Sequence, residues 1–270
     1  MLASELQFFR NAVVGVAAAL LCTSAMAIKY GELDGDGHPH VGLMVAKVDG
    51  VPRWRCSGTL ISPTVFLTAG HCTYGATSVE VWFDPDMQTN STAKGYPLTG
   101  EVNGTPYTHP DYNPNAFVLF DLGVVVLNTA VSKSVYGQLP ALDQLDELKT
   151  QRGRQGTTFT AVGYGLQRSF PDAAAWQNSA QKVRMVATPH LIAINVPGFT
   201  GDFSMLLSNN ANTGGTCFGD SGGPNFLGDS NVIAGVTSFG INGNCAGTGG
   251  VYRVDRQDDL DWLEYILSNY

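Results

Sequence analysis

The chain has 270 residues, of which 44% are hydrophobic and 14% are charged, with 32 Gly and 13 Pro. These fractions exclude a disordered chain, which needs far more charge, and a collagen, which needs Gly at a strict period. The formal net charge of −8 argues against nucleic acid as the main partner, because neutralising phosphates requires clustered Lys and Arg. At this length, one large domain or two small ones can bury a complete core.

The N-terminal segment has the pattern of a secretory signal peptide. A weakly positive start precedes an unbroken apolar run of 11 residues at 12–22. This run is too short to span a bilayer, which takes roughly 20 residues, but it fits the apolar region of a signal peptide, and Ala25-Met26-Ala27 supplies a small–x–small site for cleavage after Ala27. We therefore expect a signal peptide at 1–27, a mature chain that begins at Ile28, and secretion to the extracellular space or the periplasm. An uncleaved membrane anchor is the alternative.

Short β-rich runs recur along the rest of the chain and are bounded by Gly, Pro, Asn or Asp. They lie at 41–48, 58–61, 65–69, 79–83, 122–127, 157–162, 232–237 and 250–254. Many short strands without interleaved helices favour an all-β sandwich or barrel over a parallel α/β fold. We expect a boundary between two β halves to fall between Ala130 and Thr157.

Two segments have helical spacing instead. Near mid-chain, leucines recur at Leu142, Leu145 and Leu148. At the C-terminus the spacing predicts a helix with one apolar face, formed by Leu260, Leu263, Ile266 and Leu267. Acidic residues at 258, 259 and 261 occupy its first turn, at the positive end of the helix dipole. We expect this helix to dock against the rest of the protein, because its polar face has too few Lys and Arg for a membrane surface.

Four cysteines remain after the signal segment is removed: Cys56, Cys72, Cys217 and Cys245. An even number in an exported chain indicates disulfides, and four cysteines allow three pairings. Pairing each cysteine with its neighbour along the chain closes two short loops, each of which contributes about 3 kcal/mol in a loop-entropy estimate. The chain has no C-x-x-C pair, which weakens a metal-site interpretation.

The sharpest local motif surrounds Ser221, in the segment Gly219-Asp220-Ser221-Gly222-Gly223. Flanking glycines let the backbone approach a ligand closely. The segment also satisfies G-x-S-x-G, the nucleophile elbow of α/β-hydrolases, but those enzymes place their His after the Ser. The last His of this chain is His190, which lies upstream of Ser221. Chain order and the strand-rich pattern therefore argue against that fold.

A base and an acid that could activate this serine lie earlier in the chain. A Ser hydroxyl is a weak nucleophile and needs a base within hydrogen-bond reach, which an acid in turn orients. His71 follows the apolar run 65–67 and is a candidate base. Asp121 precedes the apolar run 122–127, where a carboxylate is costly unless it is paired. Asp121 therefore needs a partner, and His71 is the natural one.

Together these motifs resemble those of the trypsin/chymotrypsin-type serine endopeptidases, in the same order along the chain. Segments 56–61 and 67–72 resemble the histidine motif, Asp121-Leu122 opens the aspartate motif, and 219–224 resembles the serine motif. Four further segments resemble the first strand, the Gly-rich turn of the second half, a substrate-binding strand and the segment before the terminal helix: 38–43, 162–165, 236–240 and 250–252. Phe239 stands where the family usually has Trp.

The resemblance implies an all-β fold of two six-stranded antiparallel β-barrels packed side by side, with a C-terminal α-helix. The peptidase domain would span 28–270. Within it, the N-terminal barrel would occupy about 41–130, the C-terminal barrel about 155–254 and the helix about 257–268.

The resemblance also implies roles for individual residues. Ser221 would attack the scissile carbonyl, His71 would accept its proton and return it to the leaving amine, and Asp121 would hold the His tautomer. The backbone N–H groups of Gly219 and Ser221 would form the oxyanion hole. The implied disulfides are Cys56–Cys72, which would hold the histidine loop, and Cys217–Cys245, which would join the serine loop to a wall of the specificity pocket.

A further implied pair concerns activation. In this family a freed hydrophobic N-terminus commonly buries its ammonium against the Asp that precedes the catalytic Ser. Here the pair would be Ile28 and Asp220, so that removal of the signal peptide would itself activate the enzyme. The alternative is that Asp220 caps local backbone amides.

The substrate pocket implied by the resemblance is uncharged. Gly215, two residues before Cys217, would lie at its base, and no acid lies between Asp202 and Cys217 to pair with a Lys or Arg of the substrate. We therefore expect large apolar or aromatic residues before the cut. The expected substrate-binding residues are Gly215, Thr216, Ser238, Phe239, Gly240 and Gly250.

These inferences predict a secreted serine endopeptidase that forms an acyl-enzyme on Ser221 and acts on protein or peptide substrates. We expect no cofactor and no metal, because the acids Glu80, Asp84 and Asp86 are too irregularly spaced for a Ca²⁺ loop. We also expect a monomer with no nucleic-acid partner and no membrane association after signal cleavage. Two alternatives stay open: a catalytically silent family member that acts as a binding protein, and an esterase that uses the same triad.

Overall fold

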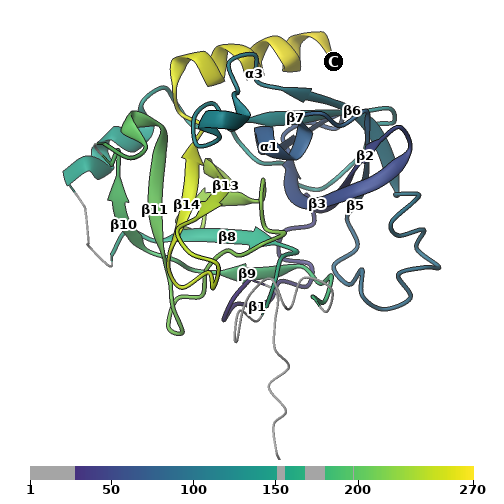
Figure 1. Cartoon of the computed structure of the whole chain (residues 1–270), viewed down its shortest axis with the longest axis horizontal. Helices are drawn as coiled ribbons and strands as arrows, with labels where there is room; N and C mark the ends of the chain where they lie inside the picture. Colours follow the sequence, from purple (N-terminus) through teal and green to yellow (C-terminus); the bar gives the residue numbers. More distant parts are fainter. Residues whose placement is uncertain (1–27, 151–155, 168–179, 197) are drawn as a thin grey trace, which may run out of the picture.

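The computed structural model describes residues 28–150, 156–167, 180–196 and 198–270, so the expected signal peptide at 1–27 lies outside the described residues. The described residues form two β units and a C-terminal helix (Figure 1). The strands are β1 (Glu32–Leu33), β2 (Val41–Val48), β3 (Val51–Leu60), β4 (Val65–Thr68), β5 (Ser78–Trp82), β6 (Val102–Thr108), β7 (Gly123–Leu127), β8 (Phe159–Gly163), β9 (Met185–Ala187), β10 (Leu191–Ile194), β11 (Ser204–Asn209), β12 (Pro224–Leu227), β13 (Ile233–Gly240) and β14 (Gly247–Arg253). The helices are α1 (Gly70–Thr73), α3 (Gln257–Asn269) and the 3₁₀ helices η1 (Pro114–Ala116), η2 (Gln144–Thr150) and η3 (Gly201–Phe203).

The first unit is a closed barrel with the strand order β2-β3-β4-β7-β6-β5. Each neighbouring pair is antiparallel. The apolar runs of β4 and β7 pair with each other, with Thr68 opposite Gly123. Every residue of β4 is buried. This pairing brings the ends of two sequence-distant segments together, and the candidate site lies at these ends.

The second unit is a curled sheet with the strand order β1-β9-β8-β12-β13-β14-β11-β10. An isolated bridge between Thr158 and His190 brings the start of β8 beside the start of β10. The all-β class, the two β units and the C-terminal helix are therefore confirmed. Counted over the described residues, the second unit is a curled half-barrel of eight strands, in which β8-β12-β13-β14-β11-β10 make a run of six and the bridge at His190 brings the two ends of that run together. The two additional strands are β9, which pairs with β8, and β1, from the N-terminal segment, which pairs antiparallel with β9.

The two helical segments expected from the sequence are present. The mid-chain leucines fall in the region of η2, where Leu145 is fully buried. The helix α3 follows the second unit but lies across the first barrel (Figure 1), and its Leu263 and Ile266 belong to a core cluster that includes residues of both units. None of the described helices combines the length and the apolar character needed to cross a bilayer.

One of the acids expected in the first turn of α3 is buried. Asp259 is fully buried, and it accepts a hydrogen bond of 2.9 Å from the Tyr252 hydroxyl. Burial raises the pKa of Asp259 to about 8. The carboxyl group is therefore part of the packing between α3 and β14, because it lies on the buried side of the helix.

A buried histidine lies at the start of β2. His40 is fully buried, its ring is 5.6 Å from that of Phe226, and neither ring nitrogen has a hydrogen-bond partner among the described residues. Nearby, Arg184 Nε donates to Asp34 Oδ2 over 2.8 Å. Burial, followed by the charges of His38 and Arg184, lowers the pKa of His40 from 6.5 to about 4. The ring therefore stays neutral in the folded protein.

We expect this histidine to make the protein less stable in acid. The unfolded chain takes up a proton on His40 near pH 6.5, whereas the folded protein does so only near pH 4. The stability that comes from the neutral ring is thus fully present above pH 6.5 and is lost as the pH falls toward 4, by about 3 kcal/mol. Chemical unfolding of the wild type and of His40→Phe at several pH values measures this loss. If both proteins lose the same free energy between pH 7 and pH 4, His40 is not its source.

Candidate active site

His71 and Asp121 are held against each other by the pairing of β4 with β7. His71 lies on α1, which begins two residues after β4 ends, and Asp121 lies two residues before β7. The Asp121 carboxylate accepts a hydrogen bond of 2.8 Å from the backbone N–H of His71. His71 Nδ1 lies 2.9 Å from Asp121 Oδ2 and 3.1 Å from Oδ1. These contacts fix both the position of the imidazole and the nitrogen that faces the acid.

The Asp121 carboxylate is fully buried, but it is well provided with donors. Besides the two donors of His71, Ser238 Oγ donates to Asp121 Oδ2 over 2.5 Å. A buried carboxylate is tolerated when its charge is paired and hydrogen bonded. Burial of the His71 ring opposes its protonation, but the charge and the hydrogen bond of Asp121 outweigh burial, so the pKa of His71 is raised above 6.5. The pair has the electrostatics of a base that can hold a proton during a reaction.

Ser221 lies on a loop that is fixed to the first barrel through Ser57 of β3. The Ser57 N–H donates to the Ser221 carbonyl over 2.8 Å, and Ser57 Oγ donates to the Gly219 carbonyl over 2.9 Å. Gly222 has a φ of +78°, and a Cβ there would lie 2.0 Å from Thr68 Oγ1. Only glycine fits this position, because a side chain would clash and the backbone is in the left-handed region. The loop therefore holds Ser221 at the junction of the two units.

Two backbone donors beside Ser221 are available to a ligand. Within the described parts of the chain, the N–H groups of Gly219 and Ser221 have no hydrogen-bond acceptor. Their neighbours are used, since Asp220 N–H donates to the Cys217 carbonyl over 3.0 Å and Gly222 N–H to the Thr237 carbonyl over 2.7 Å. Two free N–H groups beside a hydroxyl can stabilise a negative oxygen that forms during acyl transfer.

A cavity of about 870 Å³ brings His71, Ser221 and Gly219 together. Four of the residues expected to bind substrate also line it: Thr216, Ser238, Phe239 and Gly240. Ser238 thus has two contacts, because it faces this cavity and also donates to Asp121. The cavity has the size of a small-molecule or peptide side-chain site.

Gly215 and Gly250, the other two expected substrate-binding residues, do not line this cavity. A Cβ at Gly215 would lie 2.4 Å from Asn209 Cγ, and a Cβ at Gly250 would lie 2.3 Å from the Phe239 ring. Asn209 is almost fully buried, and its side-chain amide donates to the Thr216 carbonyl over 2.7 Å. The space beside each glycine is thus filled by a neighbouring side chain.

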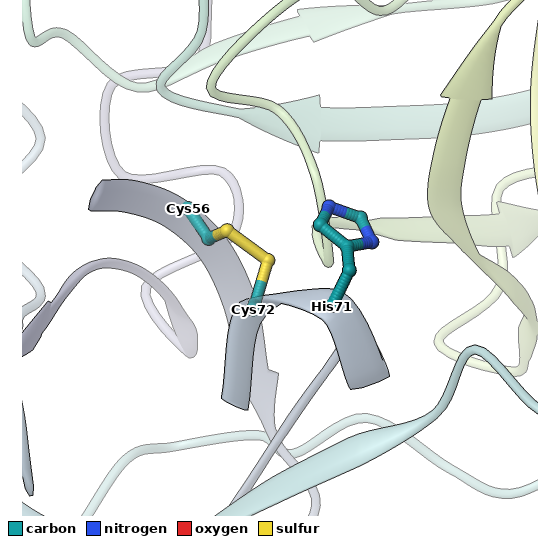
Figure 2. Close-up of side chains that lie close together, drawn as sticks. All are labelled: Cys56, His71 and Cys72. Carbon is teal, nitrogen blue, oxygen red and sulfur yellow. A yellow bond between two sulfur atoms is a disulfide. The ribbon is translucent and has the colours of Figure 1, made fainter. Parts of the chain in front are cut away.

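Both disulfides lie next to the candidate site. Cys56 is joined to Cys72, with a Cα–Cα distance of 6.2 Å, and Cys217 to Cys245, with 5.4 Å. These are the two pairs that the family resemblance implies. Figure 2 shows His71 on the same helical turn as Cys72, so the first disulfide ties this turn to β3. Ligand-type atoms of Cys56, His71 and Cys72 lie within 4.8 Å of one another, but both sulfurs are consumed in the disulfide.

Asp220, expected to pair with a freed N-terminus, is fully buried. Its carboxylate accepts hydrogen bonds from the N–H groups of Gly165, over 2.7 Å, and Cys217, over 2.9 Å. Burial raises the pKa of Asp220 to about 7, because two amide donors only partly replace the lost hydration. Ile28 is also fully buried, in a small cluster with Ala161, Met185 and Ala187. The carboxylate therefore caps backbone amides in the chain as described.

Glu80 and Asp84 are each paired with a lysine ammonium group. Lys47 Nζ lies 2.7 Å from Glu80 Oε1, and Lys94 Nζ lies 2.7 Å from Asp84 Oδ2. Asp86 accepts hydrogen bonds from the N–H groups of Gln88 and Thr89. These carboxylates thus serve as local structural acceptors.

Several residues of the cavity were not identified from the sequence. Arg53, Trp54 and Arg55 of β3 line it on the side of the first barrel. Their position directly before Cys56 was the only available signal, because a disulfide partner of the residue after His71 has to lie near the site. Asn209, which does not line the cavity, was also missed; a bridge between Asn210 and Gly214 holds it beside Gly215.

Comparisons with known proteins agree with this geometry. The trypsin family model matches residues 37–262. The chain is 27% identical to chymotrypsin of Phaedon cochleariae over 239 residues, which cover 84% of this chain and 76% of that protein. It is 29% identical to brachyurin of Leptuca pugilator over 192 residues, covering 70% and 77% of the two chains.

The fold is also similar to that of solved structures. HL collagenase matches with a TM-score of 0.68 and 23% identity over 91% of this chain and all of that chain. A variant of human heparin binding protein matches with a TM-score of 0.64 and 19% identity over 90% of this chain and 98% of that chain. Because the family model covers most of the chain, the protein belongs to the trypsin family of serine proteases.

Proposed function

We propose that the protein is a secreted serine endopeptidase that cleaves peptide bonds through an acyl-enzyme on Ser221. The observation that carries this proposal is the hydrogen-bonded pair of His71 and Asp121, which opens into the same cavity as Ser221 and two free backbone donors. The family match supports a peptidase at the level of the family. The expected signal peptide supports secretion.

Each step of the proposed reaction has a group to perform it. His71 removes the proton from Ser221 Oγ as the oxygen attacks the scissile carbonyl carbon, and Asp121 stabilises the resulting imidazolium. The N–H groups of Gly219 and Ser221 stabilise the carbonyl oxygen as it becomes negative. His71 then donates its proton to the leaving amine, and the acyl group stays on Ser221. Water, deprotonated by His71, later releases the acyl group and regenerates the serine.

We further propose that the residue before the cut is large and apolar. Phe239 and the uncharged Thr216 and Gly240 line the cavity, and none of its described lining residues is an acid that could pair with a substrate Lys or Arg. Hydrolysis of Arg substrates far above Phe or Leu substrates would contradict this preference.

The test of the proposed function begins with covalent labelling. A fluorophosphonate should add one phosphonyl group to Ser221, identified by peptide mass mapping, and the reaction should stop when the protein is unfolded. Digestion of casein and of a peptide library should then yield new termini, and the library reports the residue before each cut. A protein that is not labelled is a catalytically silent binding protein, whereas one that is labelled and hydrolyses esters but no peptides is an esterase.

We also propose that cleavage after Ala27 activates the enzyme by freeing the Ile28 ammonium to pair with Asp220. Two observations support this pairing. Asp220 is buried with no cation bound to its carboxylate among the described residues, and its pKa is raised to about 7. The Lys29 carbonyl accepts from Gly215 N–H over 3.0 Å, which holds the Ile28 segment beside the loop that leads to Asp220.

The variant Ile28→Asp, produced with residue 28 as its N-terminus, should fold but lose most of its activity. An acid at this position cannot occupy the apolar cluster of Ala161 and Met185, so the ammonium is not held in place. Circular dichroism and titration with a fluorophosphonate measure folding and active sites separately. A chain that retains Ala27 before Ile28 is the matched control for the charge, because it keeps the Ile28 side chain but makes the Ile28 nitrogen a neutral amide and moves the ammonium to Ala27. Full activity in either protein would refute the activation pair.

A further inference from the structure

The cavity beside Ser221 is cationic, although the protein as a whole has a net charge of −8. Its described lining residues include Arg53 and Arg55 but no Asp or Glu. Throughout the described chain, neither guanidinium has an ion pair or a hydrogen bond. Arg53 is exposed and Arg55 is half-buried. Two unpaired guanidinium groups in a substrate cavity are therefore available to a ligand, since a structural Arg of this kind is normally neutralised by the protein itself.

Arg55 lies directly beside the catalytic loop. It precedes Ser57 by two residues on β3, so the two side chains point to the same side of the strand. Ser57 contacts the carbonyls of Gly219 and Ser221. A Cβ at Gly219 would lie 3.1 Å from Arg55 Nη2, which places the guanidinium next to the proposed oxyanion hole.

A third cation borders the same wall. Lys182 Nζ lies 5.1 Å from the ring centroid of Tyr96, and Tyr96 lines the cavity. Burial, followed by the charge of Arg55, lowers the pKa of Lys182, so the two cations are close enough to repel each other. Lys182 Nζ also lies 3.0 Å from Gln88 Oε1, which is neutral. The positive charges along this wall therefore reinforce one another.

The position of these cations indicates which residues of a bound substrate they contact. The leaving amine takes its proton from His71, which belongs to the first barrel, so the residues after the cut leave along that side. The expected pocket for the residue before the cut, around Ser238 and Gly240, belongs to the second unit. Arg53 and Arg55 come from β3 of the first barrel. Their charges therefore face the residues that follow the scissile bond.

We propose that the protein selects substrates with an acidic residue, Asp or Glu, among the first three positions after the cut, through Arg55 and Arg53. This inference rests on the proposed function, because it assigns a substrate class to the same site. A carboxylate there would form a charge-assisted, bidentate contact with a guanidinium. The contact would be partly open to solvent, so salt would weaken it.

Peptides that are identical except for Glu or Gln at one of the three positions after the cut test this selectivity. We expect kcat/KM to be about five- to tenfold higher for Glu than for Gln at the best position in low salt. The ratio should fall toward one in 1 M NaCl, and a Lys at that position should be disfavoured. Arg55→Gln should bring the ratio to within about twofold, and Arg55→Lys should restore part of it.

Lys149→Gln is the matched control, because it removes one positive charge at an exposed residue that pairs with Asp146 on the protein surface. It should leave the Glu-to-Gln ratio unchanged. The proposal is overturned if the wild type cleaves Glu and Gln peptides equally, or if Arg55→Gln slows both by the same factor, which would mark Arg55 as a positioning residue for the catalytic loop. These results differ from failure of the proposed function, in which no peptide is cleaved and no fluorophosphonate is bound.

Discussion

Replacement of Ser221 by Ala is expected to lower kcat/KM for peptide cleavage by about a million-fold. The change removes the only atom that could carry the acyl group in the proposed reaction, while His71, Asp121 and the two backbone donors remain. The residual rate should still exceed that in water, because the donors can stabilise a carbonyl oxygen attacked by a water molecule.

The fold should survive this substitution. Ser221 is tied to the first barrel through its backbone carbonyl, which accepts from the Ser57 N–H, and Ala keeps that contact. Thermal unfolding should therefore give nearly the same midpoint as the wild type. Ser230→Ala is the matched control, since Ser230 is an exposed serine in the turn between β12 and β13. Retention of more than a small percentage of activity in Ser221→Ala would show that a different group is the nucleophile.

The second large effect is expected for Asp121→Asn, which should lower kcat by about 10⁴-fold, the size seen for this change in serine proteases. The carboxylate accepts from His71 Nδ1 and backbone N–H and from Ser238 Oγ. An amide cannot accept all three, and its NH₂ group favours the wrong tautomer of His71. It also leaves the imidazolium without its counter-charge.

The pH dependence of this variant separates its two effects. His71 has to be neutral to act as a base, so activity should fall as the pH drops through the pKa of His71, which Asp121 raises above 6.5. Without the carboxylate, burial of the ring dominates, and the acidic limb should move to lower pH. Rate profiles from pH 4 to 9 measure this shift. Asp229→Asn, at an exposed acid, is the control, and an acidic limb that moves upward in Asp121→Asn would contradict the proposed pairing.

Much of the site could be predicted from local sequence. The strands β4 and β7 are apolar apart from Thr68, and His71 and Asp121 lie just outside their ends. The glycines around Ser221 are needed by the local backbone, since at Gly222 the positive φ and the close approach of Thr68 leave no room for a side chain. Such constraints act within a few residues, so they leave a readable pattern.

Other parts of the site depend on contacts between distant segments. The tie between Ser57 and the serine loop spans more than 160 positions and brings Arg55 to Gly219. The N-terminal strand β1 extends the second sheet because an edge of β9 is free to pair with it, which a strand pattern alone does not specify.

By itself, the sequence determined the strand-rich class, the order of the three chemical motifs and the terminal helix, because apolar periodicity and glycine geometry are local properties. Only the tertiary structure decided that Ser238 donates to Asp121, that β1 pairs with β9 at the edge of the second sheet, and that two unpaired arginines face the cavity. These features follow from which strand edges pair and in which register. The pairing and register that are adopted are those that minimise the free energy of the whole chain, so the sequence of one segment does not determine them.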